Sequence, residues 1–120
     1  MGGAGAWHLG AHYTDRWCVV SPGAGFAETA EYNKLTPDRY PPVYEQKLWG
    51  CYDVPGYVRN LFNVPVIAYS GEKDKQIQAA RVMEAAYQRE GRMLPHLIGP
   101  NVEHKYEPAT LQELLRQIAA

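Results

Sequence analysis

Three short polar segments of the chain hold the residue types best suited to chemistry. They are SPGAG at 21–25, SGEKDK at 70–75 and GPNVEHKY at 99–106. The second segment carries Asp74 and the third carries His104. An aspartate that orients an imidazole, which then acts as a general base, is a recurrent arrangement in hydrolytic sites. We therefore expect Asp74 and His104 to meet.

Each polar segment follows a stretch with the composition of a buried strand. Hydrophobic patterning predicts strands at 17–21, 64–69 and 94–98, with helices at 3–13, at 75–89 and after a Thr110–Glu113 capping box. Strands that alternate with helices form a parallel sheet with helices on its faces. The predicted fold class is α/β, with about three parallel strands and flanking helices. In such a sheet the carboxyl ends of the strands share one edge, which places the three segments together.

Residues 27–63 interrupt this alternation with prolines and aromatic residues. We expect a long irregular excursion with short helical pieces, one of them at 57–62 capped by Asp53. Such an excursion serves as a lid or partner surface, or it covers the sheet and fills core. The 120 residues suit a single domain, 1–120, that includes this excursion.

Composition excludes several classes of partner. The net charge is −1 and no long block of like charge occurs, which argues against nucleic acid and membrane surfaces. No apolar run approaches the roughly 18 residues of a membrane span. No secretory signal is visible, so we expect a cytoplasmic protein. Cys18 and Cys51 do not make a disulfide framework, and Cys18 is expected in the core.

The ordered motifs resemble the C-terminal half of an α/β-hydrolase of the esterase and prolyl-oligopeptidase-like type. Such enzymes carry G-x-S-M-G-G at the nucleophile elbow, and MGGAGAWHLGAHY resembles the part that follows the serine. SGEKD is similar to the loop of the acidic residue, and VEHKY to the histidine loop. The resemblance implies a truncated α/β-hydrolase in which Asp74 orients His104 and His104 is the base.

The elbow serine of that motif has no counterpart in the chain. Ser21 is the best substitute nucleophile, because it ends the strand that would adjoin the missing one, although a backbone-bonded strand-end serine is the simpler interpretation. Ser70 is a weaker candidate that shares the loop of Asp74 and supports its turn. The amides of SPGAG are candidates for an oxyanion nest.

His8 and His12 have the i, i+4 spacing of a two-histidine metal site. No third ligand is evident nearby, so a packed helical pair is the better interpretation, and His96 is expected to be structural. We predict no metal and no cofactor.

The predicted activity is hydrolysis of small carboxylic esters, with His104 as base, Asp74 as its orienter and Ser21 as substitute nucleophile. The alternative is a catalytically inactive, self-associating fragment. In either case the sheet edge at 17–21 lacks a neighbouring strand, which predicts a homodimer or higher oligomer that buries this edge. A weaker third interpretation is binding of small aromatic ligands by the tyrosine-rich excursion.

Overall fold

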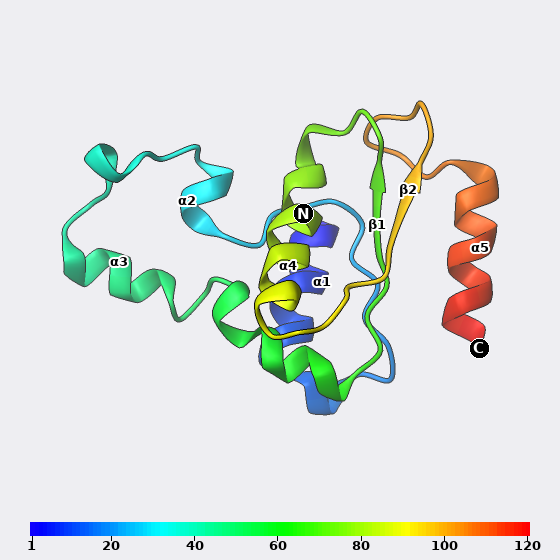
Figure 1. Ribbon diagram of the computed structural model, residues 1–120, viewed down its shortest axis with the longest axis horizontal. Coiled ribbons are helices and arrows are strands. Elements are labelled where there is room, and N and C mark those ends of the chain that lie inside the picture. Colours follow the sequence, from blue (N-terminus) through cyan, green and yellow to red (C-terminus); the bar gives the residue numbers. More distant parts are fainter.

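The computed structural model describes residues 1–120, which include a small parallel sheet with helices on both of its sides (Figure 1). Strand β1 (Ala68–Gly71) pairs in parallel with β2 (His96–Gly99), with Ala68 opposite His96 and Gly71 opposite Gly99. On the other side of β1, parallel bridges join Val20 to Val66 and Gly23 to Tyr69. The prediction of an α/β fold with three parallel segments is confirmed.

The first of these three segments is not a regular strand, and this corrects the prediction for 17–21. Within it a single isolated bridge joins Val20 to Val66, with a second just beyond it at Gly23, and Cys18, expected in the core, is exposed. The physical reason is that the segment has a hydrogen-bonding neighbour on one side only, so nothing covers its outer edge.

Five α-helices and four short 3₁₀ helices surround the sheet. The α-helices are α1 (Gly2–His12), α2 (Thr29–Tyr32), α3 (Val43–Trp49), α4 (Gln78–Arg89) and α5 (Pro108–Ala119). The 3₁₀ helices are η1 (Thr14–Arg16), η2 (Pro37–Arg39), η3 (Pro55–Asn63) and η4 (Lys75–Ile77). None of the helices has the length and apolar character needed to cross a membrane.

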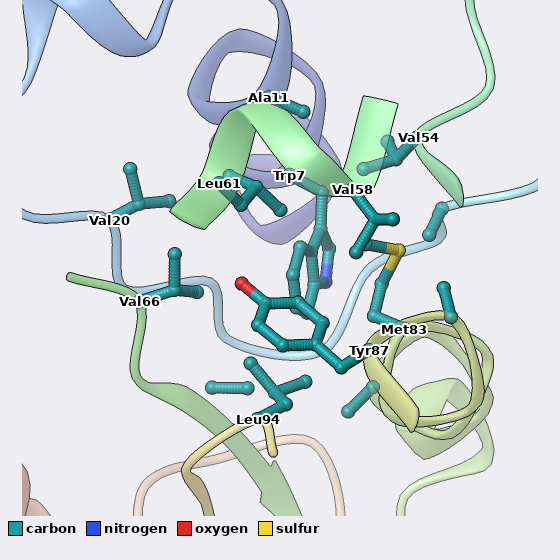
Figure 2. Close-up of a cluster of buried hydrophobic side chains, with 14 of the residues drawn as sticks. Trp7, Ala11, Val20, Val54, Val58, Leu61, Val66, Met83, Tyr87 and Leu94 are labelled. Carbon is teal, nitrogen blue, oxygen red and sulfur yellow. The ribbon is translucent and has the colours of Figure 1, made fainter. Parts of the chain in front are cut away.

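The two faces of β1 pack into different apolar clusters. Val66 and Ala68 join the larger cluster with α1, η3 and α4, where Trp7 and Met83 are almost completely buried (Figure 2). Ile67 and Tyr69 face the other way and pack against α5. Because successive residues of a strand point to opposite faces, a single apolar run contributes side chains to the clusters on both faces of the sheet. The segment that leads into β1 is thereby packed between helices on both faces.

The excursion at 27–63 divides into an arm and a packed end. Helices α2 and α3 project to one side of the body in Figure 1, and α3 has no buried residue. The interpretation that the whole excursion covers the sheet is therefore wrong for α3. At its other end, η3 inserts Val58 and Leu61 into the core.

Two helix caps differ from the sequence prediction. Helix α5 begins at Pro108, and Glu107 caps it by accepting hydrogen bonds from the amides of Ala109 and Thr110, at 3.2 and 2.8 Å. Proline at the first helical position favours this earlier start, which places Thr110 inside the helix. Asp53 does not cap η3. Its Oδ1 instead accepts from the amide and hydroxyl of Thr29.

Candidate active site

Asp74 and His104 lie together, as their positions after adjacent parallel strands predict. His104 Nδ1 is 2.8 Å from Asp74 Oδ2. The Asp74 side chain is only 5% exposed, whereas the imidazole is 64% exposed. The carboxylate is thus anchored inside the protein, and the second ring nitrogen of His104, Nε2, has no protein partner and is open to a reactant.

The conformation of Asp74 is set by the short helix that follows it. Asp74 is the N-cap of η4, and its Oδ1 accepts a hydrogen bond from the Gln76 amide at 2.8 Å. One oxygen therefore caps the helix while the other receives the imidazole. Aspartate is a preferred N-cap residue, so local sequence and site geometry favour the same side-chain orientation.

The loop that carries His104 is fastened to the loop that carries Asp74. The Glu72 amide donates to the Gly99 carbonyl and the Lys73 amide to the Val102 carbonyl, both at 2.9 Å. Gly71 allows this close approach, because a Cβ at that position would collide with the Glu103 carbonyl oxygen. A glycine is required here by space, since the two backbones touch.

Tyr69 braces the far side of the His104 loop. Its hydroxyl donates to the Lys105 carbonyl at 2.9 Å and accepts from the Glu107 amide at 2.8 Å. Its ring stacks on Tyr106 with centroids 4.6 Å apart. Sequence reasoning missed this residue, and the available signal was a tyrosine directly before Ser70 in an otherwise aliphatic buried strand.

A cavity of about 320 Å³ opens beside the imidazole. Its lining residues are Met1, Gly2, Gly3, Ser21, Gly23, Gly25, Gln76, His104 and Tyr106. Ser21 and His104 therefore share one cavity, but no hydrogen bond joins them. The Ser21 hydroxyl has no partner in the protein, so the simpler interpretation of a backbone-bonded serine does not hold.

The predicted oxyanion nest in SPGAG is wrong for two of its amides. The Ala24 amide donates to the Tyr69 carbonyl at 3.0 Å, and the Gly25 amide donates to Gln76 Oε1 at 3.1 Å. Both residues have positive φ, 55° and 89°. Pairing with β1 uses the Ala24 donor and the Gln76 side chain uses the Gly25 donor, so neither amide remains for a ligand.

Ser70 lies away from this cavity. It is completely buried in β1, and its hydroxyl has no hydrogen-bond partner, so it does not support the turn as predicted. A hydroxyl enclosed in this way cannot reach an ester. Ser21 is the one serine at the site, since the chain has no third.

The remaining histidines lie elsewhere. His8 stacks on Tyr52 with centroids 4.0 Å apart, and His12 Nε2 lies 3.1 Å from the Tyr52 carbonyl oxygen. His96 is buried against Glu84. No three His, Cys, Asp or Glu side chains gather in a way that could hold a metal ion.

The strongest electrostatic perturbations also fall outside the cavity. Burial raises the pKa of Tyr87 to about 12. The pKa of Glu113 is lowered to about 2 by hydrogen bonds from Arg116 and Gln117. The candidate site is therefore defined by its geometry.

Two solved esterase structures share this fold, and the chain spans about half of their length. A ferulic acid esterase superimposes with a TM-score of 0.64 and 16% sequence identity, covering 97% of this chain and 47% of its own. The apoenzyme of S-formylglutathione hydrolase from Staphylococcus aureus gives a TM-score of 0.62 and 15% identity, covering 98% of this chain and 49% of its own. No protein-family model and no curated protein matches the sequence.

Proposed function

We propose that this chain provides the acid–base part of a hydrolase site for small carboxylic esters. His104 is the general base and Asp74 orients it. The observation that carries the proposal is the 2.8 Å contact between His104 Nδ1 and a buried, helix-capping carboxylate. The fold shared with two esterases supports ester hydrolysis as the reaction class.

In this proposal His104 Nε2 removes a proton from the attacking hydroxyl, and Asp74 holds Nδ1–H and stabilises the imidazolium that forms. Ser21 is the candidate nucleophile, because its unpartnered hydroxyl lines the cavity beside His104. Oγ attacks the ester carbonyl, the imidazolium returns the proton to the leaving alcohol, and water then releases the acyl group. The proposed substrates fit a cavity of about 320 Å³.

Turnover of p-nitrophenyl acetate tests the proposal. We expect His104→Ala to lower kcat/KM by roughly 10³-fold or more. His12→Ala, which removes an imidazole outside the cavity, is the matched control. Equal turnover in His104→Ala and in the unaltered chain would contradict the proposal.

Ser21→Ala tests the nucleophile separately. If Ser21 attacks the ester, this variant should lose as much turnover as His104→Ala. Full activity in Ser21→Ala together with loss in His104→Ala would instead mean that His104 either acts directly on the ester or activates a water molecule as the nucleophile.

A second candidate role, self-association, is favoured by the edge at 17–21. Val20 exchanges hydrogen bonds with Pro65 and Ile67, so the backbone groups of Val19 and Ser21 point away from β1 and have no partner. A groove of about 320 Å³ lies along this edge, beside the exposed Trp17 and Leu9. Two copies paired antiparallel about Val19 would satisfy these groups symmetrically.

Light scattering distinguishes this role from catalysis. We expect a dimer whose dissociation constant rises in Val19→Pro, since proline removes an outward donor that the folded chain does not use. A monodisperse monomer at high concentration would exclude self-association without touching the ester-hydrolase proposal.

A further inference from the structure

Gln76 contacts both Asp74 and the cavity beside His104. Its backbone amide donates to Asp74 Oδ1 at 2.8 Å, which ties its position to the carboxylate that holds His104. Its side chain lines the cavity shared by Ser21 and His104. It also lines a second cleft of about 370 Å³ whose lining residues, His104 among them, are all polar.

The orientation of the Gln76 amide follows from its hydrogen bond. The Gly25 N–H donates to Oε1 at 3.1 Å, and only the oxygen of a glutamine side chain can accept. The NH₂ group of Gln76 therefore occupies the other terminal position of the amide, Nε2. Nε2 has no acceptor in the protein, so the two N–H donors of this cavity-lining side chain remain unused.

The Gly25 donor is itself held in place. Gly25 has a φ of 89°, and a Cβ at this position would collide with the amide of Ala4. Helix α1 and the 21–25 loop thus fix the Gly25 amide, and the Gly25 amide fixes the glutamine. The hydrogen bond to the Gln76 carbonyl oxygen fixes the whole side-chain amide, so its NH₂ group needs little reorganisation when a reactant arrives.

We propose that the Gln76 side-chain amide binds the carbonyl oxygen of the ester and stabilises the negative charge that forms there during attack. The inference rests on the proposed ester hydrolysis. The Ala24 and Gly25 amides are engaged within the fold. The side chain of Gln76, which is bonded to Gly25, therefore offers its own N–H donors to the substrate in their place. Amide side chains are effective oxyanion donors in a partly enclosed site. The step makes and breaks no covalent bond at Gln76.

Gln76→Glu is the decisive variant. Its carboxylate retains an acceptor for the Gly25 amide, but an oxygen replaces the NH₂ group that faces the substrate. We expect kcat for p-nitrophenyl acetate to fall roughly 10²-fold on the pH plateau of each protein, with KM little changed and the Tm preserved. Gln76→Ala should lose a similar factor. Gln78→Glu makes the same change two residues away, outside the cavities, and should behave like the unaltered chain.

A purely structural role for Gln76 gives a different pattern. The glutamate variant would then keep its activity, because the bond to Gly25 survives, and the alanine variant alone would lose it. That pattern would overturn the inference while His104→Ala still supports the proposed function.

If turnover proves independent of His104, the proposed function fails by itself, and a binding measurement decides the role of Gln76. The probe is acetanilide, an uncleaved carbonyl compound, titrated against ¹⁵N-labelled protein. A saturable shift of the Gln76 side-chain NH₂ signals, with Gln78 unmoved, supports carbonyl binding. An unmoved Gln76 signal overturns it.

Discussion

The two sides of the cavity are built differently. On the acid–base side, residues 69–76 and 99–107 are joined by hydrogen bonds of 2.8–3.1 Å at Tyr69, Glu72, Lys73 and Asp74. On the helix side, residues 1–3 and 19–25, the outward backbone groups of Val19 and Ser21 are unpaired. The orientation of His104 is therefore fixed within this chain, whereas the helix side leaves part of its hydrogen-bonding capacity unused. Variants on each side should show whether this contrast has functional meaning.

The largest effect should come from Asp74→Asn on the acid–base side. Asparagine can still cap η4 through its oxygen, but it then turns an NH₂ group toward His104 Nδ1 and stabilises the wrong imidazole tautomer. We expect kcat to fall roughly 10²- to 10⁴-fold while the Tm changes little. Steady-state kinetics with p-nitrophenyl acetate and a thermal melt measure both.

Asp74→Ala provides the comparison for that result, because it removes the cap as well as the acceptor. It should lower both activity and Tm. If Asp74→Asn retained full activity, the carboxylate would act only as a helix cap. The proposed role of Asp74 in orienting His104 would then be contradicted.

On the helix side, Gly3→Ala should destabilise the fold. A Cβ on Gly3 would collide with the Gly23 carbonyl, where α1 crosses the 21–25 loop. Overpacking typically costs about 1–3 kcal/mol. The matched control is Gly2→Ala, since a Cβ at Gly2 meets nothing within 4 Å. Urea unfolding of the two variants compares the costs, and equal midpoints would show that α1 moves freely on this side.

The proximity of Asp74 and His104 could be predicted from sequence because it depends on topology alone. Asp74 and His104 each follow a buried strand, and adjacent parallel strands end at one edge. Helix α4 was also predictable from its apolar spacing and from Gly91, which adopts a φ of 72° where the helix ends.

The rest of the site depends on distances that the sequence pattern does not contain. The Tyr69 hydroxyl reaches Lys105 and Glu107 across the sheet edge, and the Gln76 side chain meets Gly25 from 51 residues away. The oxyanion nest failed for the same reason, because the Ala24 and Gly25 amides bond to Tyr69 and Gln76, which are remote in sequence. Residue type suggests a donor, but only packing decides whether that donor is already engaged.

A smaller effect is expected for Tyr69→Phe, which removes the brace of the His104 loop. The Lys105 carbonyl and Glu107 amide lose their partner, at a cost of about 1–3 kcal/mol, and kcat should fall because His104 becomes less well placed. Tyr87→Phe is the matched control, because the buried Tyr87 hydroxyl has no hydrogen bond in the protein and Tyr87 does not line the cavity. Chemical denaturation and kinetics of both variants measure the difference. Identical behaviour would mean that the loop does not need the brace.

The smallest effect concerns Glu107, which links the His104 loop to α5. Hydrogen bonds from the Thr110 hydroxyl, then from the Thr110 and Ala109 amides, lower the pKa of Glu107. A carboxyl with a lower pKa in the folded state stabilises the fold above its unfolded pKa, and this contribution is lost as the pH falls through the folded value. Glu107→Gln should therefore lower the Tm slightly at neutral pH and flatten its decline in acid. Melts between about pH 3 and 7 test this.

Glu113→Gln should flatten the same acid limb, because the pKa of Glu113 is also lowered. It should leave turnover unchanged, however, since Glu113 does not touch the loop of His104. An effect of Glu107→Gln on kcat that Glu113→Gln lacks would extend the acid–base side to the start of α5.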